Sequence, residues 1–292
     1  MTYFIVNPIA GKGRAQARTE EINAHMTGDF RVVMTTAPKH AKELAEQAVR
    51  EGAKTVVAVG GDGTIQEVVS GLAGSDCAFG VIPSGSGNDF VKSVDIDETL
   101  PTAGHLDIIR GGNIRAIDLV KINDSCFANI GSIGIDAQIV VVADKLKKIF
   151  GKAAYVMAAL WCTMTKGATP MSIKVDDALY ERKFTLVAVC NGWNYGGGFK
   201  IAPSAKNDDG QLTLCMIDGM SKPAMTVLFP RVIKGTHVTL KQVSFMDCKK
   251  AEINFEGTQL INLDGNLNHM TGPLKFEIMP TALNVLVEKG FD

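Results

Sequence analysis

The chain has 292 residues, of which 46% are hydrophobic and 21% are charged. This balance is typical of a folded protein with one large domain or two ordinary ones, and it excludes a disordered chain. The formal net charge is −1, and no run of lysine and arginine is long enough to form a basic tail. Both observations argue against a nucleic-acid-binding protein.

The cysteines and the apolar segments bear on the cellular compartment. The six cysteines lie far apart and form no C-x-x-C pair, which favours reduced thiols in a cytoplasmic protein over a zinc site. The first residues lack the positive region and the apolar length of a signal peptide. The longest apolar stretch, residues 153–164, has 12 residues, whereas a membrane-spanning helix needs about 20. The sequence therefore predicts no transmembrane segment.

The first hundred residues alternate between strand-like and helix-like segments. Four short apolar runs are rich in β-branched residues: residues 3–6, 30–35, 55–59 and 78–82. Apolar residues at helical spacing follow the second run and the third. Strands without polar alternation are typical of a parallel sheet that is covered on both faces. The sequence predicts an α/β domain over residues 1–118, with a mostly parallel sheet and flanking helices.

After about residue 105 the pattern changes to strand-like runs separated by turns. Residues 274–278, for example, alternate between apolar and charged side chains, which is typical of a sheet with one face in water. The sequence predicts a C-terminal antiparallel β-sandwich-like domain over residues 119–280, with one helical insertion from residue 136 to about residue 166. Residues 281–292 are predicted to form a terminal strand that returns to the first domain.

A glycine-rich loop follows the third strand-like run. Its sequence, Gly60-Gly61-Asp62-Gly63-Thr64, opens the next helix, so the backbone and the first helical N–H groups can approach a phosphate closely. Asp62 suits such a site only if Mg2+ or a substrate hydroxyl lies between its carboxylate and the phosphate. The alternative is a structural turn in which Asp62 is the helix N-cap. The motifs G-x-x-x-x-G-K-[ST] and G-x-G-x-x-G after a strand are absent.

Two similar loops follow other strand-like runs. Residues 83–90, Pro-Ser-Gly-Ser-Gly-Asn-Asp-Phe, come after the fourth run, and residues 7–13, Asn-Pro-Ile-Ala-Gly-Lys-Gly, come after the first. Each loop alone is a weak signal, because turns are rich in these residues. Loops at the carboxyl ends of neighbouring parallel strands converge on one edge of the sheet. Together, these three glycine loops predict a phosphate-binding site at that edge.

In order and spacing, these motifs resemble the diacylglycerol kinase catalytic-domain family, especially its soluble bacterial lipid kinases, and more distantly the sphingosine kinases. The resemblance covers nearly the whole chain, although the 60–64 loop is shared with NAD kinases and phosphofructokinases. Besides the three glycine loops, the matching elements are Thr35 through Pro38 to His40-Ala41, Asp118-Leu119, Asn191-Gly192, Gly196-Gly197-Gly198, Ala202-Pro203, Asp208-Asp209-Gly210 and Leu263-Asp264-Gly265.

The resemblance implies a kinase with ATP and Mg2+ as cofactors. Such an enzyme would transfer the γ-phosphate to a hydroxyl of diacylglycerol or a related lipid, from the cytoplasm and in peripheral contact with the inner face of the membrane. Its nucleotide site would comprise Asn7, Pro8, Ile9, Ala10, Gly11, Thr35, Gly60, Gly61, Asp62, Gly63, Thr64, Ile65, Gln66 and Ser86.

The resemblance also implies two further groups of charged or metal-binding residues. Lys12, Lys92 and Asp118 would form a charged cluster that links the two domains; a surface ion pair worth about 0–1 kcal/mol is the alternative. A structural Mg2+ would be held at Lys206, Asp209 and Gln211 by backbone carbonyls and one carboxylate, which suits this ion. An ordinary hairpin turn is the alternative for that segment.

Four residues are predicted to act in catalysis: Asp264, Asn266, Asp62 and Asp89. A lipid hydroxyl is a poor nucleophile, and a carboxylate that accepts its proton contributes about 10²–10⁴-fold. The resemblance implies Asp264 as this base, with Asp62 and Asp89 near the phosphates and Mg2+. The family's motif is Asp-Gly-Glu, whereas this chain has Asn266 in the last position. An asparagine can hydrogen-bond but can neither act as a base nor give Mg2+ a negative charge.

Two other functions stay open at this point. One is an NAD kinase-like phosphotransferase with a soluble substrate, and the other is a lipid- or nucleotide-binding protein that has lost catalysis through Asn266. The sequence does not decide between a monomer and a homodimer. The lysine-rich segment 145–152 and the apolar run after it fit a helix on anionic lipid. A helix packed on the sandwich with a solvated lysine face is the favoured interpretation.

Overall fold

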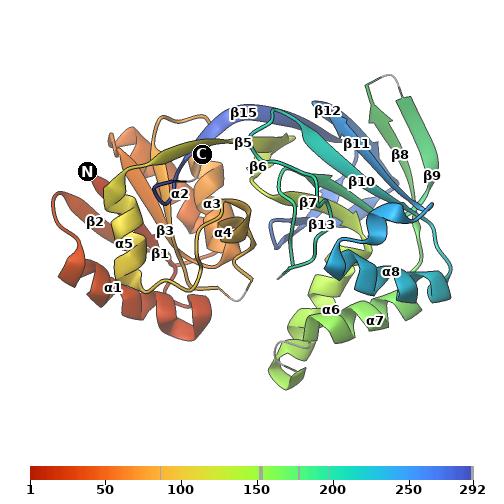
Figure 1. Cartoon of the computed structure of the whole chain (residues 1–292), viewed down its shortest axis with the longest axis horizontal. Helices are drawn as coiled ribbons and strands as arrows, with labels where there is room; N and C mark the ends of the chain where they lie inside the picture. Colours follow the sequence, from red (N-terminus) through yellow and green to blue (C-terminus); the bar gives the residue numbers. More distant parts are fainter. Residues whose placement is uncertain (86, 151–153, 177, 197, 291–292) are drawn as a thin grey trace.

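The computed structural model describes residues 1–85, 87–150, 154–176, 178–196 and 198–290, without the side chains of residues 147–149. It has two lobes (Figure 1). Two long strands, β5 (Ile114–Ile122) and β15 (Leu274–Leu286), run from one lobe to the other. The N-terminal lobe is a parallel sheet flanked by helices, and the C-terminal lobe consists mainly of antiparallel strands. The predicted fold class is confirmed.

The sheet of the first lobe has the strand order β2-β1-β3-β4-β15-β5. Four of these strands run parallel to one another: β1 (Thr2–Val6), β2 (Phe30–Met34), β3 (Thr55–Gly60) and β4 (Ala78–Pro83). The last part of β15 pairs in parallel with β4 and antiparallel with β5. The four predicted runs therefore correspond to these four parallel strands.

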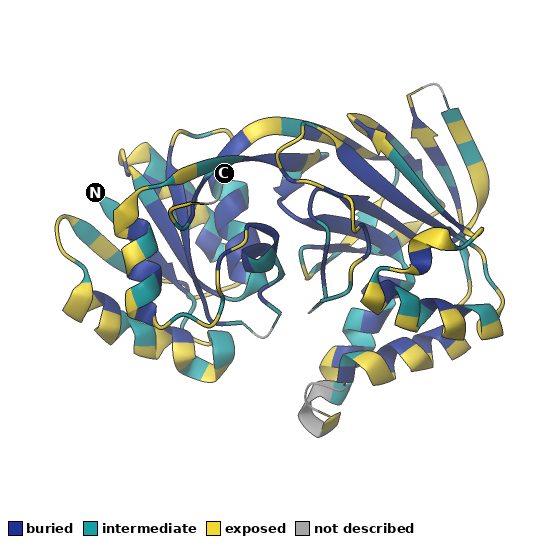
Figure 2. Cartoon of the chain, in the orientation of Figure 1, coloured by how far each residue is buried: buried dark blue, intermediate teal, exposed yellow. Residues whose placement is uncertain are grey.

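Helices cover both faces of this sheet. Tyr3 and Ile5 pack toward α2 (His40–Arg50) and α3 (Asp62–Leu72), whereas Phe4 and Val6 pack toward α1 (Arg14–His25) and α5 (Thr102–Gly111). Alternate strand residues point to opposite sides, so both sets are buried, as the dark strands of this lobe show in Figure 2. Burial on both faces is the reason that β1, β3 and β4 are almost continuously apolar, whereas β2, at the edge of the sheet, exposes Arg31 and Met34. Two short segments, η1 (Ala10–Gly13) and α4 (Asp89–Ser93), belong to the glycine loops.

The second lobe is an antiparallel, sandwich-like assembly. Its strands pair in the order β14-β13-β7-β9-β8-β12-β15, with β10 between β9 and β11, and β6 beside β5. The side chains of Phe127, Phe184 and Phe276 lie in its apolar core. The strand bounds are β6 (Ser125–Phe127), β7 (Ile130–Gly134), β8 (Thr169–Val175), β9 (Ala178–Cys190), β10 (Leu212–Asp218), β11 (Val243–Cys248), β12 (Lys250–Asn254), β13 (Thr258–Leu263) and β14 (Asn266–Thr271).

Three helices lie along one side of the second lobe (Figure 1). Two of them, α6 (Ile135–Phe150) and α7 (Ala154–Thr165), correspond to the predicted insertion. The prediction of a single insertion was wrong, because α8 (Lys222–Lys234) and the short η3 (His237–Thr239) also interrupt the strands. Pro223 stands in the first turn of α8, where a missing N–H removes no helical hydrogen bond, so this proline does not prevent the helix.

The two strands that join the lobes are irregular at one position. Their register shifts between Met279 and Leu283 of β15, opposite Asp118 of β5. The buried Asp118 carboxylate accepts hydrogen bonds from the amide of Thr281 over 2.8 Å and from the amide of Gly210 over 2.7 Å. Asp118 therefore fixes the bulge that lies between the two lobes.

Candidate active site

The three glycine loops meet at the carboxyl ends of β1, β3 and β4. The side-chain amide of Asn7 donates a hydrogen bond to Thr64 Oγ1 over 3.0 Å. The backbone amide of Ser84 donates to the Gly60 carbonyl over 2.7 Å. A Cβ atom on Gly11 would lie 2.2 Å from the Ser84 carbonyl oxygen, so the 7–13 loop also touches the 83–90 loop. The loops form one continuous surface.

Gly61 and Gly85 bring two of these loops into backbone contact. A Cβ atom on Gly85 would lie 2.9 Å from Gly61 Cα, and a Cβ atom on Gly61 would lie 3.2 Å from Gly85 Cα. A side chain at either position would push the loops apart. Glycines at the start of a helix leave the backbone uncovered, so its N–H groups can approach a phosphate closely.

Asp62, the first residue of α3, binds the neighbouring loop. Its carboxylate oxygens accept hydrogen bonds from the amides of Asn88 over 2.9 Å and Asp89 over 2.7 Å. Burial raises the pKa of Asp62, and these N–H groups oppose that rise. Asp62 therefore positions the 83–90 loop, and with it Asp89, beside the glycine surface.

Glu98 holds the same loop from its other side. Its carboxylate lies 3.4 Å from Lys92 Nζ and accepts a hydrogen bond from the Asn88 side-chain amide over 2.9 Å. Lys92 Nζ also donates to the Gly87 carbonyl over 2.5 Å. The sequence reasoning missed Glu98, because no motif marks its position.

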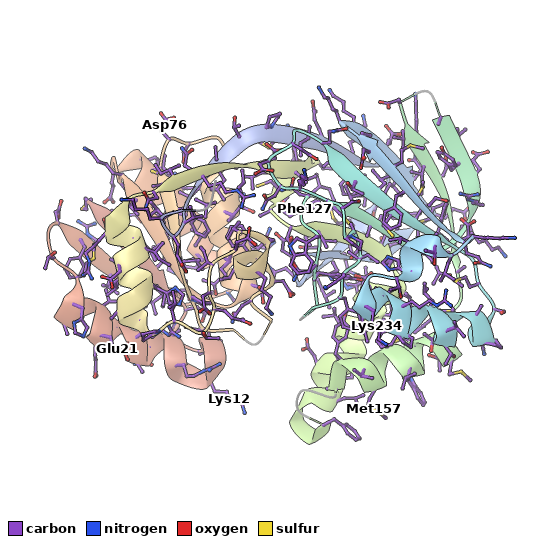
Figure 3. All side chains as sticks on the ribbon, viewed as in Figure 1. Lys12, Glu21, Asp76, Phe127, Met157 and Lys234 are labelled. Atoms are coloured by element: carbon purple, nitrogen blue, oxygen red, sulfur yellow. The ribbon has the colours of Figure 1, made fainter. Side chains whose placement is uncertain are left out.

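Lys92 and Asp118, which with Lys12 make up the predicted charged cluster, have other direct partners in the structure. Among these three described residues there is no mutual hydrogen bond or ion pair: Lys92 is paired with Glu98, and both oxygens of Asp118 are taken by backbone N–H groups. Lys12 is exposed and projects from the edge of the first lobe (Figure 3). Asp118 supports the bulge instead, since backbone donors already satisfy its carboxylate.

The other residues assigned to the nucleotide site differ in accessibility. Ile9 is 82% exposed, with Pro8 and Ala10 partly exposed beside it. Thr35 is buried, and its amide donates to the Val6 carbonyl over 2.9 Å. The side chain of Ile65 lies in the apolar core, so only its backbone could meet a ligand. Ser86 lies outside the described residues.

Asp264 is held by three consecutive backbone amides at the start of β7. Its carboxylate accepts hydrogen bonds from Ala128 over 2.7 Å, Asn129 over 3.0 Å and Ile130 over 2.8 Å. Burial raises the pKa of Asp264 to about 6, although these N–H groups oppose the rise; the negative charge of Asp62 adds to it. Asp264 is therefore an oriented carboxylate that is more basic than an ordinary aspartate.

Asn266 reaches across from the second lobe to α3, the helix that begins in the 60–64 loop. Its side-chain amide donates to Gln66 Oε1 over 2.8 Å and to the Gly63 carbonyl over 3.4 Å. A Cβ atom on Gly63 would lie 2.8 Å from Asn266 Oδ1, so a side chain there would displace the Asn266 amide. The structure thus brings the predicted acceptor-side residues against the 60–64 loop.

Two buried asparagines connect Asp264 of the second lobe with Asp89 of the first lobe. Asn129, whose amide binds Asp264, donates through its side chain to the Asn194 carbonyl over 2.6 Å. The Asn194 side chain in turn lies 3.5 Å from Asp89 Oδ1. Both asparagines are buried and each has an unpaired Oδ1. The sequence reasoning missed them, since only the neighbouring Asn191-Gly192 pair carried a signal.

Arg14 is another residue at this site that the sequence reasoning missed. Its Nε donates to the Gly11 carbonyl over 3.0 Å, and its Nη2 donates to the Gly85 carbonyl over 3.3 Å. This side chain therefore ties the 7–13 loop to the 83–90 loop. Its position directly after a glycine loop was the available signal.

The segment predicted to hold a structural Mg2+ lies next to the bulge. Lys206, Asp209 and Gln211 are exposed, and Asp209 accepts a hydrogen bond from the Gln211 amide over 3.0 Å. Partial desolvation and the nearby carboxylates of Asp118, Asp247 and Asp208 raise the pKa of Asp209. A cation would relieve this repulsion, so the oxygen donors fit Mg2+. Within the described ranges, no group of three or more His, Cys, Asp or Glu side chains is suited to a metal.

A narrow apolar cavity of about 50 Å³ lies beneath α6, α7 and α8. One carboxylate, Asp136, lies on its wall; burial raises the pKa of this group. Its Oδ2 accepts hydrogen bonds from the Ser132 hydroxyl and, over 3.2 Å, from the Asn262 side chain. Its Oδ1 is buried without a partner. The cavity therefore offers a buried carboxylate oxygen in largely apolar surroundings.

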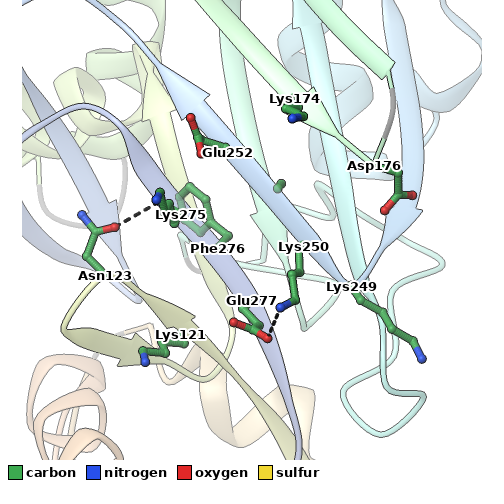
Figure 4. A pocket seen from close by; sticks show the side chains of 11 residues that line it. Lys121, Asn123, Lys174, Asp176, Lys249, Lys250, Glu252, Lys275, Phe276 and Glu277 are labelled. Carbon is green, nitrogen blue, oxygen red and sulfur yellow. Dashed lines mark hydrogen bonds and ion pairs between the residues drawn. The ribbon is translucent and has the colours of Figure 1, made fainter.

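A wider hollow of about 700 Å³ lies on the outer face of β5, β15, β12 and β8 (Figure 4). Charges of opposite sign stand opposite each other across these strands: Lys250 pairs with Glu277, and Glu252 stands between Lys275 and Lys174. Lys250 and Glu277 form an ion pair of 2.7 Å. Such pairs stabilise a solvated sheet face, so this hollow is not assigned to the active site.

Two family models match the chain. A model of the diacylglycerol kinase catalytic domain matches residues 1–122, and a model of the YegS C-terminal NAD kinase beta sandwich-like domain matches residues 129–287. A diacylglycerol kinase of Mycobacterium tuberculosis is 30% identical over 97% of this chain and 93% of that protein. The chain belongs to the diacylglycerol kinase family. The resemblance that the motifs indicated is confirmed.

Other members of this family match over similar lengths. A diacylglycerol kinase of Bacillus subtilis is 28% identical over 87% of this chain and 84% of its own length. A Pseudomonas aeruginosa protein named "Probable lipid kinase YegS-like" is 28% identical over 94% and 92%. A crystal structure of a Bacillus anthracis protein has a TM-score of 0.82 at 22% identity, covering 99% of this chain and 97% of that one, which shows the shared fold. Across the part of this chain that the structure describes, no helix is long and apolar enough to cross a membrane.

Proposed function

We propose that the chain is an ATP-dependent lipid kinase that transfers the γ-phosphate to a hydroxyl of diacylglycerol or a related lipid. The observation that carries this proposal is the approach of Asp264 and Asn266 to the 60–64 loop from the opposite lobe. The three glycine loops offer backbone groups to phosphates on one side, and an oriented carboxylate comes from the other. A hydroxyl between them would face both a phosphate and a base.

Asp264 has the properties of a general base. Three N–H groups hold its carboxylate in one orientation and leave capacity for one more hydrogen bond. Its pKa of about 6 lies near neutral pH, so the group is mostly ionised and still basic. In the proposed step, Asp264 accepts the hydroxyl proton while the hydroxyl oxygen bonds to the γ-phosphorus and the bond to ADP breaks.

The cofactors in this proposal are ATP and Mg2+. The nucleotide would lie on the three glycine loops, and bound Mg2+ would neutralise phosphate charge, with the Asp89 carboxylate as a candidate ligand. Asp62 holds Asp89 in place through its backbone amide. Lys206, Asp209 and Gln211 would hold a second, structural Mg2+.

The apolar cavity supports a lipid as the acceptor. Its lining is almost entirely apolar, and the free oxygen of Asp136 could accept a hydrogen bond from a lipid headgroup. At about 50 Å³ the cavity is too small for an acyl chain, so α7 or α8 would have to move outward to admit one.

The proposal is tested with labelled ATP, Mg2+ and a panel of lipids in mixed micelles, with NAD as a parallel acceptor. We expect label in diacylglycerol or a related lipid. Label in NAD instead would favour the NAD kinase-like alternative. Measurable ATP binding with no labelled product would favour a binding protein that has lost catalysis.

A further inference from the structure

The turn that carries Asp264 is a tight hairpin between β13 and β14. Leu263 pairs with Asn266, so Asp264 and Gly265 alone form the turn, with φ angles of 47° and 89°. Two positive φ angles in succession are typical of a type I′ turn. A residue other than glycine keeps such a conformation only where its surroundings hold it there. The position of Asp264 therefore depends on the contacts that fix this turn.

Asn262, in β13 of the second lobe, is one of these contacts. Its side-chain Oδ1 accepts a hydrogen bond from the backbone amide of Gly265 over 2.9 Å. The carboxylate of Asp264 is bound elsewhere, by the amides of residues 128–130. The turn thus has one anchor at its carboxylate and another, Asn262, at the peptide group that follows.

The other end of the Asn262 side chain reaches the wall of the apolar cavity. Its Nδ2 donates to Asp136 Oδ2 over 3.2 Å. Ser132, which stands opposite Asn262 where β7 pairs with β13 (Figure 1), donates to the same Oδ2 through its hydroxyl. Because Nδ2 donates and Oδ1 accepts, the two partners of Asn262 allow only one orientation of its amide group.

Burial makes both contacts of Asn262 costly to lose. The residue is 2% exposed, so water cannot replace either partner. A buried polar group that loses one partner keeps the cost of desolvation and gains nothing in return. The peptide group of Gly265 and the carboxylate of Asp136 therefore belong to one hydrogen-bond network, and Asn262 is the link between them.

We infer that Asn262 is a positioning residue, which fixes the turn of the catalytic base against the carboxylate on the cavity wall. This inference rests on the proposed function, in which Asp264 accepts the hydroxyl proton. Asn262 lies in the second lobe, whereas the three glycine loops lie in the first. Its loss should therefore misplace the base and leave the nucleotide loops unchanged.

The first test measures transfer from ATP to a short-chain diacylglycerol dispersed in detergent. Asn262→Leu is similar in size but makes neither hydrogen bond, and its kcat should fall about 10- to 100-fold, as for a group displaced by about 1 Å. Its Kd for ATP, measured by calorimetry, should stay within about twofold of that of the unmodified chain. Asn254→Leu is the matched control and should keep full activity, because Asn254 binds Glu252 within β12, away from the turn. Unchanged kcat in Asn262→Leu, or an equal loss of ATP affinity, would overturn the positioning role.

Hydrogen exchange of the Gly265 amide tests the network without any activity. In Asn262→Leu this amide loses its acceptor and should exchange about 2- to 10-fold faster. Asp136→Leu should have the same effect indirectly, because Asn262 is then free to turn away. Asp136→Asn keeps an acceptor for Nδ2 and should keep the protection. Unchanged exchange in Asp136→Leu would overturn the link to the cavity wall.

The two tests fail separately. If the unmodified chain phosphorylates no lipid, the proposed function fails, whereas exchange of the Gly265 amide still decides whether Asn262 and Asp136 hold the turn. If Asn262→Leu does not fold, the difference in exchange between Asp136→Leu and Asp136→Asn decides the same question.

Discussion

Asn266 of β14 donates a hydrogen bond to Gln66 of α3 over 2.8 Å and so joins the two lobes beside the 60–64 loop. Gln66 also donates to the Cys126 carbonyl, over 3.0 Å, which fixes the orientation of its own amide group. The side-chain amides of Asn266 and Gln66 therefore make this contact, whereas the family motif has a glutamate at position 266. A larger or charged side chain at position 266 would meet a surface shaped for asparagine.

The variant Asn266→Glu is expected to be less stable than the unmodified chain. Its carboxylate would face two acceptors, Gln66 Oε1 and the Gly63 carbonyl, and Gln66 cannot turn its amide without losing the bond to Cys126. The free energy of unfolding should fall by about 1–3 kcal/mol, as measured by urea denaturation. Asn266→Ala should cost less, because it adds no buried acceptor. A glutamate variant with unchanged stability would show that the amide contact does not matter.

The pH dependence of the reaction should report Asp264. The protonated group cannot accept the hydroxyl proton, so kcat/KM should decline as pH falls through about 6. Its pKa in the folded chain is raised from an ordinary value of 3.8, so its contribution to stability is present below pH 4 and is lost as pH rises to about 6. Asp264→Asn should lower transfer by about 10²–10⁴-fold. Thermal unfolding of Asp264→Asn, measured in parallel, shows whether the activity is lost because the base is missing or because the fold is. If kcat/KM of this variant still declined near pH 6, the decline would belong to another group.

Removing the carboxylate of Asp62 should weaken nucleotide binding. In Asp62→Ala the amides of Asn88 and Asp89 lose their acceptor, so the 83–90 loop loses its fixed position. A cost of about 1–3 kcal/mol corresponds to a Kd for ATP raised about 5- to 150-fold, measurable by calorimetry. Asp76→Ala is the matched control, since Asp76 is an exposed carboxylate on the same lobe (Figure 3). Equal affinities in the two variants would contradict the positioning role.

A methyl group at Gly85 should separate two of the glycine loops. Its Cβ would lie 2.9 Å from Gly61 Cα, a backbone atom that cannot turn aside. Overpacking of this kind costs about 1–3 kcal/mol, so ATP binding by Gly85→Ala should fall at least about fivefold. Gly167→Ala provides the control, because a Cβ at that glycine meets nothing within 4 Å. Tight ATP binding by the Gly85 variant would show that the loops need not touch.

Magnesium should raise the Tm through Asp209. Several carboxylates surround this group, and a bound cation would offset their repulsion. Addition of Mg2+ should raise the Tm of the unmodified chain and leave the Tm of Asp209→Ala nearly unchanged. The control Asp124→Ala, at an exposed turn, should keep the full Mg2+ response. A full response in the Asp209 variant would place the cation elsewhere.

Local patterns were sufficient to predict most of the fold. Strands β1, β3 and β4 of the first lobe are almost continuously apolar because helices cover both faces, and that burial is visible in the sequence. Helix α8 was not predicted, although Pro223 stands in its first turn, where a helix tolerates proline. The direct partners of Asp118 are the backbone amides of Gly210 and Thr281, and spacing alone does not show that backbone amides already satisfy a carboxylate.

By itself, the sequence determined that three glycine loops follow parallel strands, and therefore that one sheet edge could bind phosphate. This inference needs only the common direction of the strands. The tertiary structure decided what faces that edge. Asp264 and Asn266 lie beside Asp62 and Gln66, although about 200 residues of chain separate the two pairs. They come together because β5 and β15 join the second lobe to the first. Contacts at such separation depend on how the lobes pack, so no local pattern could have revealed them.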